Sequence, residues 1–532
     1  MVTFAQLRDA KLEPLSDAVT AWTKLVKKLE SAEDDYRGKL LKPLRDSKWQ
    51  GKTATVAVQT LVPFTQYFRV SATEASSIAS VLDTGHRQFT AAQNKLKRAV
   101  DGANGLHVSV GDDGSIQLPQ TSDANEQKRL KAQAGIIQGQ LAQAVKEATE
   151  ADNRIAQALG KLGPEILDRP NSALNAADDA KMAAGLAGFD KNNIPPKGVD
   201  TPKEAADWWR SLPEEQRHLM MNAFPEQIGW LNGIPSEDRD EANRVSLAHR
   251  IAQLEEQKGV LNGPERTELG QLKKLQAQLG ALDSHGRDAY LLGIDSRSHD
   301  GRAVVAVGNP DHAKHTGVLV PGWGNNLDGF GTTLDRANRL QDLSSQYADG
   351  NVSTIAWLGY DPPLNAEEWA AGQQGAPALN ATVDGLRQAQ ADAGTNSQVT
   401  VIGHSYGSTL VGEAAKNGGL HANDIVVAGS PGTHVSHASD LHVGANHVWS
   451  EVGSSDPIPA VGKAAHGGMP EPSGHYDPSV SNVLPSDPRF GGNRMQTDTG
   501  GHTEYWTPNS ESMKNQARVI AGRYNDVTHA RG

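Results

Sequence analysis

Apolar residues recur every three or four positions from residue 4 to about residue 41, and again from Val56 to Val100. This spacing places the apolar side chains along one face of a helix. Pro43 and Gly51 interrupt the pattern between the two runs, and both residue types break helices. The sequence therefore predicts two long amphipathic helices joined by a short turn, as an antiparallel hairpin. In the first helix the apolar positions are Leu7, Leu12, Leu15, Val19, Trp22, Leu25 and Leu29.

The next part of the chain is more polar and less regular. Two short alternating runs between residues 106 and 118 predict a small β-hairpin, and a polar helix is expected from about Ser122 to Leu162. Residues 164–202 are rich in Pro, Asn, Asp and Gly, which is typical of a linker. Helical patterns return from Trp208 to about Leu282.

Short apolar runs bounded by Gly, Pro and Asp alternate with helical segments beyond residue 285. This alternation predicts βαβ units and a mostly parallel sheet flanked by helices. Many of the runs are rich in β-branched residues, which suits buried interior strands. The predicted strands are Ala289–Ile294, Arg302–Val307, Gly317–Val320, Thr354–Leu358, Val399–Ile402, Ile425–Ala428 and His447–Glu451.

The chain is 532 residues long, which exceeds what a single hydrophobic core organises, so several domains are expected. The patterns divide it into four parts. These are a helical hairpin (1–105), a β-hairpin with a long helix and a linker (106–202), a helical segment (203–284) and an α/β domain (285–532).

Composition limits the classes of partner and of chemistry. Lys and Arg number 51 and Asp and Glu number 63, a formal net charge of −12, which does not suit nucleic acid as a partner. No run approaches the about 18 to 20 apolar residues of a transmembrane segment. Charges at Arg8, Asp9 and Lys11 do not fit a cleaved signal peptide, so we expect a cytoplasmic protein or one exported without such a peptide. Cysteine is absent, so a nucleophile would be a serine, a threonine or a carboxylate.

One segment combines a strand, a tight turn and a helix around a serine. The predicted strand Val399–Ile402 runs into Gly403-His404-Ser405-Tyr406-Gly407, and small residues then begin a helix. A Gly-x-Ser-x-Gly turn in this context is a nucleophile elbow, in which the glycines keep side chains out of crowded packing. The helix N-terminus also places a positive dipole where an oxyanion develops. Ser405 is therefore the candidate nucleophile, and an ordinary turn serine is the alternative.

A catalytic triad on this pattern needs an acid and then a base after the serine. Asp456 follows the predicted strand His447–Glu451 and precedes Pro457, so its carboxylate can orient a histidine. His502 stands in a glycine-rich loop just before the last predicted helix, Ser510 to Gly522. We expect Asp456 as the acid and His502 as the base. The alternatives are Asp440 and Asp477 for the acid, and His466 and His475 for the base.

Two backbone N–H groups are expected to bind the oxyanion, and the first is that of Tyr406. The run Val318 to Asn326 has the pattern of the loop that supplies the second donor. The N–H of Trp323 is the candidate for it, with Gly324 beside it. A plain turn at the end of a strand is the alternative.

Residues 1 to about 100, with Trp49-Gln50-Gly51 at the predicted turn, resemble the WXG-like helical hairpins of actinobacterial and firmicute type VII secretion substrates. The resemblance implies export by that route. The apolar stripe of the hairpin suggests a helical-hairpin protein partner or self-association. A generic helical hairpin, with the tripeptide as a simple turn, is the alternative.

A second resemblance covers roughly residues 205–530. It is to an actinobacterial α/β-hydrolase family formerly catalogued as a domain of unknown function, and it implies the α/β hydrolase fold and the triad positions given above. The motifs that carry it are Pro321-Gly322-Trp323-Gly324, Gly403-His404-Ser405-Tyr406-Gly407, Ser455-Asp456-Pro457-Ile458, His502-Thr503-Glu504-Tyr505-Trp506, and Gly229–Pro235 with Arg239 and Asn243.

These residues predict a serine hydrolase of esterase or lipase type. It would cleave a carboxylic ester, a thioester or an amide of a small molecule or lipid through an acyl-enzyme. No cofactor is expected, because the sequence contains neither a phosphate-binding loop nor a dinucleotide fingerprint. No metal site is expected either, because His434 and His437 lack an accompanying acidic motif. The alternative is a type VII-associated interaction protein with a vestigial hydrolase domain.

Overall fold

The computed structural model describes residues 1–41, 43–44, 53, 56–57, 61, 63–163, 166, 172–284, 287–298, 301–362, 371–460 and 483–530. The chain forms two compact units. Unit 1 comprises Met1–Asn193 and Pro213–Ala223, and unit 2 comprises Ile194–Leu212 and Phe224–Gly532.

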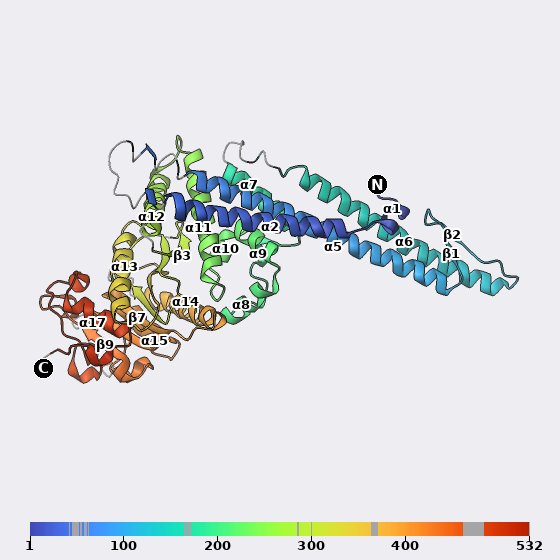
Figure 1. Ribbon diagram of the computed structural model, residues 1–532. Coiled ribbons are helices and arrows are strands. Elements are labelled where there is room, and N and C mark those ends of the chain that lie inside the picture. The colour runs from blue at the N-terminus through green and yellow to red at the C-terminus, as the bar shows by residue number, and fades with distance from the viewer. Residues whose placement is uncertain are drawn as a thin grey trace. The chain divides into compact units, whose positions relative to one another are not determined.

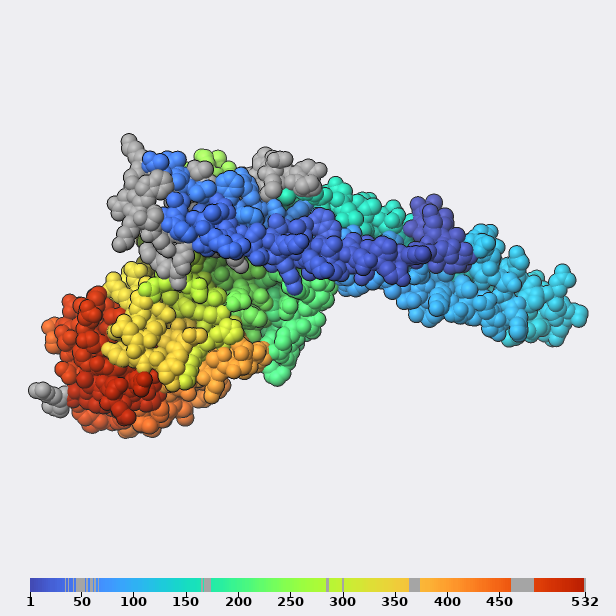
Figure 2. Space-filling model, viewed as in Figure 1, coloured from blue at the N-terminus to red at the C-terminus, as the bar shows by residue number. Residues whose placement is uncertain are grey.

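Unit 1 is built from long helices, which run from blue to teal in Figure 1, with α9 in green; the atoms of Figure 2 have the same colours. The helix α5 has 43 residues and is therefore about 65 Å long, and both α2 and α6 pack against it. The helices expected on either side of residue 50 are α2 and α5, while Trp49-Gln50-Gly51 lies outside the described residues. The elements are α1 (Phe4–Asp9), α2 (Glu13–Tyr36), η1 (Arg37–Leu41), α5 (Pro63–Gly105), β1 (Ser109–Val110), β2 (Ile116–Gln117), α6 (Ala124–Leu159), α7 (Ser172–Leu186), η3 (Lys191–Asn193) and α9 (Glu214–Ala223).

The first predicted helix is two helices in the structure. The sequence pattern predicts one helix to about residue 41, but α1 ends at Asp9, and the backbone of the next residue, Ala10, is extended (φ −60°, ψ 127°). Thr3 and Gln6 form a capping box that starts α1. Pro14 lies in the first turn of α2, where a proline is tolerated because the N–H it lacks would have no helical partner.

The helix α7 lies inside the range where composition predicts a linker. Its sequence is rich in alanine, the strongest helix former, and Ala176, Ala180 and Ala183 are buried. The prolines and glycines that favoured a linker cluster after this helix, at residues 194–198. None of the helices in the described ranges is long and apolar enough to cross a membrane.

Unit 2 contains an eight-stranded sheet in the order β10-β9-β8-β7-β5-β6-β4-β3 (Figure 1). The pairs from β10 to β6 are parallel, whereas β6 with β4 and β4 with β3 are antiparallel, so the sheet is mostly parallel, as predicted. All seven predicted strands are present, and β10 joins them in this sheet. The strands are β3 (Ala289–Asp295), β4 (Arg302–Val307), β5 (His315–Val320), β6 (Val352–Leu358), β7 (Gln398–His404), β8 (Asp424–Ala428), β9 (Val448–Glu451) and β10 (Asn493–Arg494).

The central strands of this sheet are buried on both faces. Val318 and Val401 belong to one hydrophobic core, which residues of α14 and α15 complete, and Leu319 and Ile402 belong to another, which residues of α17 complete. The carboxyl end of β7 is therefore held at the middle of the sheet edge. The helices of unit 2 are α8 (Pro202–Ser211), α10 (Pro225–Gly229), α11 (Ser236–Glu256), α12 (Gly263–Ser284), α13 (Phe330–Tyr347), α14 (Ala371–Asp392), α15 (Tyr406–Ala415) and α17 (Glu511–Ile520).

A buried carboxyl group lies at the end of β9. Glu451 is 2% exposed, and its carboxyl group accepts hydrogen bonds from Ser512 Oγ at 2.7 Å and from Gln516 Nε2 at 2.5 Å. Burial is the main reason that its pKa rises to about 8, and the nearby Asp498 acts in the same direction, although the two hydrogen bonds oppose the rise. Glu451 is therefore mostly protonated at neutral pH.

We expect the Glu451→Gln variant to lose less stability than the wild type as pH rises. The pKa of Glu451 is about 8 in the folded protein and near 4.5 ordinarily. The folded state therefore binds more protons between these values, and the free energy of unfolding falls as pH rises through this window. A neutral glutamine removes this contribution to the pH dependence of stability. Thermal unfolding followed by circular dichroism at pH 5, 6, 7 and 8 measures the pH dependence.

The matched control is Glu413→Gln. Glu413 is also buried, but His434 and Lys416 bind its carboxylate. Burial raises the pKa of Glu413, and these two partners outweigh burial and leave the pKa below its ordinary value. This variant should be less stable than the wild type at neutral pH, because it loses a charged carboxylate that His434 and Lys416 bind. Identical pH slopes for the wild type and Glu451→Gln would contradict the expectation.

Candidate active site

Ser405 occupies a tight turn between β7 and α15. Its backbone angles are φ 53° and ψ −130°, a conformation that costs a residue with a side chain about 1 to 3 kcal/mol. The N–H of Ser405 donates to the carbonyl oxygen of Ala428 at 3.0 Å, which ties the turn to the end of β8. In open α/β sheets, ligands bind beyond the carboxyl ends of the parallel strands, and Ser405 lies at this edge.

The two glycines around Ser405 allow the chain to pack closely. A Cβ atom on Gly403 would lie 2.6 Å from the Cα of Ser408, and one on Gly407 would lie 2.4 Å from the carbonyl oxygen of Val320. Any side chain at either position would push the helix away from the sheet. The spacing of the motif therefore follows from the packing of α15 against the strands.

Asp456 and His502 form a hydrogen-bonded pair in which only the Asp456 side chain is fully buried. Nδ1 of His502 lies 2.9 Å from Oδ1 and 2.8 Å from Oδ2 of Asp456. The side chain of Asp456 is 0% exposed and that of His502 is 23% exposed. Burial raises the pKa of Asp456, but hydrogen bonds from Tyr505 and His502 outweigh burial and hold the pKa below its ordinary value. The carboxylate is therefore ionised at neutral pH beside an accessible imidazole.

This pair lies at the same corner of the sheet as Ser405. His404, the residue before Ser405, has its Nε2 atom 2.8 Å from the carbonyl oxygen of His502, and the two rings are 4.8 Å apart. Gly429, directly after Ala428, borders the pair: a Cβ there would lie 2.6 Å from Oδ2 of Asp456 and 3.0 Å from Nδ1 of His502. The structure thus brings Ser405, Asp456 and His502 together at the carboxyl ends of β7, β8 and β9.

His404 is uncharged in this setting. Burial lowers its pKa to about 3, and the cation of Arg336 acts in the same direction. A neutral His404 adds no positive charge beside His502.

The loop after β5 lies against Ser405. A Cβ on Gly322 would be 2.7 Å from the Cβ of Ser405 and 3.0 Å from the backbone nitrogen of Tyr406. Tyr360 Oη donates to the carbonyl oxygen of Pro321 at 2.8 Å, which fixes the start of this loop. Gly322 therefore packs against the first turn of α15.

The other residues of this loop are more open. The indole of Trp323 is 55% exposed. Gly324 has a positive φ of 71°, and a Cβ atom at this position would meet no neighbour within 4 Å. Asn325 Nδ2 donates to the carbonyl oxygen of Gly322 at 2.8 Å and stabilises the turn. The side chain of Trp323 is therefore accessible, one residue after the glycine that contacts the elbow.

The alternative residues either have other partners or fall outside the described chain. The carboxylate of Asp440 accepts from the backbone N–H of His437 at 3.2 Å, within the short helix η5 (Ala438–Leu441). The two histidines considered for a metal site contact different carboxylates: His434 pairs with Glu413 at 2.5 Å, and His437 lies beside Asp440. The alternatives outside the described residues are Asp477, His466 and His475.

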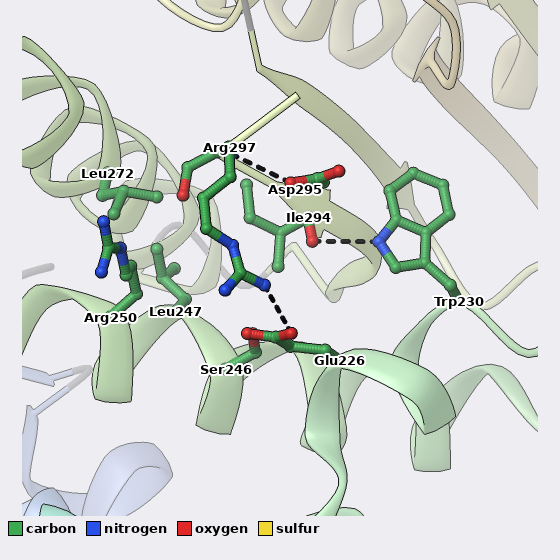
Figure 3. A pocket seen from close by; sticks show the side chains of 10 residues that line it. Glu226, Trp230, Ser246, Leu247, Arg250, Leu272, Ile294, Asp295 and Arg297 are labelled. Carbon is green, nitrogen blue, oxygen red and sulfur yellow. Dashed lines mark hydrogen bonds and ion pairs between the residues drawn. The ribbon is translucent and has the colours of Figure 1, made fainter. Parts of the chain in front are cut away.

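A small cavity of about 130 Å³ lies near the end of β3 (Figure 3). Its cations are already paired: Arg250 with Glu268 at 2.7 Å, and Arg297 with Glu226 at 2.5 Å. β3 is four strand spacings from β7, or about 19 Å at about 4.8 Å each. The cavity is therefore separate from the Ser405 site.

Tyr505 forms hydrogen bonds at the site that the sequence pattern does not reveal. Its Oη donates to Oδ2 of Asp456 at 2.5 Å and accepts from the N–H of Gly453 at 3.0 Å. The sequence signals for it are its position three residues after His502 and its place in the motif His502-Thr503-Glu504-Tyr505-Trp506, neither of which reveals the contact with Asp456. His404 and Gly429 likewise border the site through contacts that are distant in sequence.

Comparisons with known proteins match both parts of the chain. The α/β hydrolase family profile matches residues 296–466, which include Ser405 and Asp456 but not His502. The PPE family profile matches residues 7–101.

Two mycobacterial relatives illustrate the wider similarity. The uncharacterized protein Rv2079 of Mycobacterium tuberculosis is 31% identical over 400 residues, which cover 65% of this chain and 60% of that protein. The uncharacterized protein Mb0988c of Mycobacterium bovis is 32% identical over 210 residues, which cover 37% of this chain and 77% of that protein. The chain thus spans about 60% of the length of the longer relative. Together these matches establish that the chain belongs to the α/β hydrolase family through its C-terminal half and has a PPE family region in its N-terminal helical part.

Proposed function

We propose that this protein is a serine hydrolase of esterase or lipase type, with Ser405 as nucleophile, His502 as general base and Asp456 as the acid that orients His502. The observation that carries the proposal is the strained elbow of Ser405 (φ 53°) at the corner where the Asp456–His502 pair lies. An ordinary turn serine needs neither the positive φ nor an imidazole–carboxylate pair beside it.

In the proposed mechanism, His502 takes the proton of Ser405 through Nε2 as Oγ attacks the substrate carbonyl carbon. Asp456 accepts a hydrogen bond from Nδ1 of His502, so it selects the tautomer with Nε2 free to act as a base and stabilises the imidazolium that forms. The imidazolium then protonates the leaving alcohol, and an acyl-enzyme remains. Water attacks that ester by the same path in reverse and regenerates Ser405.

The backbone N–H groups of Tyr406 and Trp323 are the proposed oxyanion donors, with Gly324 completing the turn. Tyr406 is the first residue of α15, where the helix dipole is positive. The close packing of Gly322 on Ser405 and Tyr406 supports the next residue, Trp323, as the source of the second N–H. Donors aligned before the reaction stabilise the charge that develops on the carbonyl oxygen.

The proposed substrate is a carboxylic ester of a small molecule or lipid, and the same chemistry covers thioesters and amides. One feature supports an apolar acyl group: Trp323, which carries the second proposed oxyanion donor, is 55% exposed and offers an apolar surface.

We also propose that the N-terminal unit links the protein to type VII secretion, either for export or for a helical partner. The PPE family match supports the association. Several apolar side chains on the hairpin helices are exposed and suit a helical partner or self-association: Leu25 at 39%, Phe64 at 44% and Tyr67 at 46%.

Covalent labelling tests the nucleophile. A fluorophosphonate probe should modify Ser405, and peptide mapping by mass spectrometry should locate the adduct there. Ser405→Ala should abolish labelling, His502→Ala should strongly slow it, and both should lower kcat toward p-nitrophenyl esters by at least about 10⁴-fold. Ser454→Ala, in the exposed part of the loop before Asp456, is the control and should label normally. Absence of any adduct on folded wild-type protein would favour a vestigial hydrolase domain.

A substitution at Gly322 tests the oxyanion loop. Gly322→Ala would place a methyl group 2.7 Å from the Cβ of Ser405, so the loop must retreat and withdraw the Trp323 N–H. We expect kcat to fall about 10²-fold at a temperature where the variant is still folded. Gly329→Ala in the same loop is the control, because a Cβ there meets only ordinary contacts at 3.5 Å. Equal losses in the two variants would count against this assignment of the donor.

Secretion tests the proposed role of the N-terminal unit. When produced in a mycobacterial host, the intact protein should appear in the culture medium only if a type VII system is functional. Ser405→Ala should be exported to the same extent, because export does not need catalysis. Retention of both proteins in cells would leave the N-terminal unit as a partner-binding module inside the cell.

A further inference from the structure

Tyr505 lies in the hydrogen-bond network of the Asp456–His502 pair. It belongs to the short helix η8 (Glu504–Trp506), and its side chain is buried. Its hydroxyl donates to Oδ2 of Asp456 and accepts from the N–H of Gly453, so it has one partner on each side. Gly453 and Asp456 belong to one loop after β9, and Tyr505 therefore bridges the two ends of that loop.

The hydrogen bonds to Asp456 differ in what they can control. Oδ1 accepts from the backbone N–H of Ile458 at 2.9 Å, and both oxygens lie within 2.9 Å of Nδ1 of His502. Tyr505 is the only side chain besides His502 that donates to this carboxylate in the described residues. A phenol that donates to Oδ2 withdraws charge from the carboxylate and holds its plane.

The space around this contact is closed. A Cβ on Gly429 would lie 3.0 Å from Tyr505 Oη and 2.6 Å from Oδ2 of Asp456, so the backbone of Gly429 covers both groups. Asp456 has no exposed side-chain surface. Removal of the phenol oxygen therefore leaves an oxygen of a buried carboxylate short of a donor, and a buried charge without its hydrogen bonds is strongly disfavoured.

We propose that Tyr505 is a positioning residue of the hydrolase reaction, which sets the orientation and the basicity of Asp456 and, through it, the working pH range of His502. This inference rests on the proposed function of Ser405, His502 and Asp456. Tyr505 does not reach the reacting atoms, and it acts only through Asp456.

The groups around the Asp456–His502 pair determine whether loss of the Tyr505 phenol raises or lowers the pKa of Asp456. Burial raises the pKa of Asp456, and the hydrogen bonds from Tyr505 and His502 lower it. Within the described ranges, the titratable groups near the pair include His404, which is neutral, Arg336, whose cation lies beside His404, and Glu451, which is largely protonated at neutral pH. Burial, and then the bond to Asp456, raises the pKa of Tyr505 far above its ordinary value, so the phenol keeps its proton in any assay. Loss of the phenol should therefore raise the pKa of Asp456.

The test compares Tyr505→Phe with Tyr524→Phe. Tyr524 offers a matched environment, because its hydroxyl also donates to a fully buried carboxylate, that of Asp424 at 2.7 Å. Asp424 begins β8, at the opposite edge of the sheet from Gly429. Both variants lose one hydrogen bond to a buried carboxylate, but only Tyr505→Phe removes it from Asp456.

For Tyr505→Phe we expect the acid limb of the kcat/KM profile to move to higher pH by about 0.5 to 1 unit, and kcat at the plateau to fall about tenfold with little change in KM. Tyr524→Phe should keep the wild-type limb even if its unfolding temperature falls. Coincident acid limbs for Tyr505→Phe and the wild type would overturn the proposal.

A second variant covers the case in which Tyr505→Phe does not fold. Incorporation of 3,5-difluorotyrosine at position 505 keeps the shape and makes the phenol a stronger donor, so the acid limb should move to lower pH. An unmoved limb in this protein would also overturn the proposal.

A separate measurement distinguishes failure of this inference from failure of the proposed function. The low-field ¹H NMR signal of the His502–Asp456 hydrogen bond, assigned by its loss in His502→Ala, needs no turnover. Its pH titration should shift in Tyr505→Phe and stay in place in Tyr524→Phe. A shift together with absent labelling of wild-type Ser405 would support the role of Tyr505 and reject the hydrolase. Normal labelling of Ser405 with an unshifted NMR titration in Tyr505→Phe would support the hydrolase and reject the role of Tyr505.

Discussion

A buried negative charge at Asp456 shapes much of the surrounding structure. Its side chain has no solvent contact, yet the carboxyl group stays ionised because hydrogen bonds oppose the effect of burial. Such a charge is tolerated in a protein interior only when its oxygens find good donors. The donors here come from its own loop, at Ile458, and from a segment near the end of the chain, at His502 and Tyr505. The charge thus holds the C-terminal segment against the ends of β8 and β9.

The same corner depends on close approaches of backbone. Ser405 keeps its strained turn because Ala428 binds its N–H and because Gly403 and Gly407 let α15 reach the sheet. Gly429 then passes over the Asp456–His502 pair at a distance that excludes a side chain. Strain at Ser405 and the buried charge at Asp456 are therefore stabilised by one set of contacts, which explains why the site forms at the meeting point of β7, β8 and β9.

Local sequence signals were sufficient to find the elbow and the sheet. The strand before Ser405, the two glycines and the small residues of α15 lie within about 15 consecutive residues, so their pattern is directly visible in the sequence. Asp456 and His502 were predicted from their places after a strand and before the last helix, and the structure brings them together, while their catalytic roles remain a proposal. Asp440, an alternative on pattern alone, has a different partner.

Other features could not be predicted from the chain because they depend on distant contacts or on very short elements. Tyr505 meets Asp456 across 49 positions, and His404 meets His502 across 98. The strand β10 has only two residues, too few for a pattern. The helix α7 could not be predicted because the Pro, Asn, Asp and Gly residues on either side of it make residues 164–202 look like a linker.

The path of the chain between the two units has a consequence for how the molecule can be divided. Residues 213–223 belong to unit 1, although the residues on both sides belong to unit 2. They form α9, which packs on α5 and α7 and buries Leu219, Met220 and Met221. The polypeptide therefore crosses between the units three times, and no single cut separates them cleanly. A fragment that begins at residue 194 would carry α9 without α5 and α7, so the face that buries Leu219, Met220 and Met221 would be exposed.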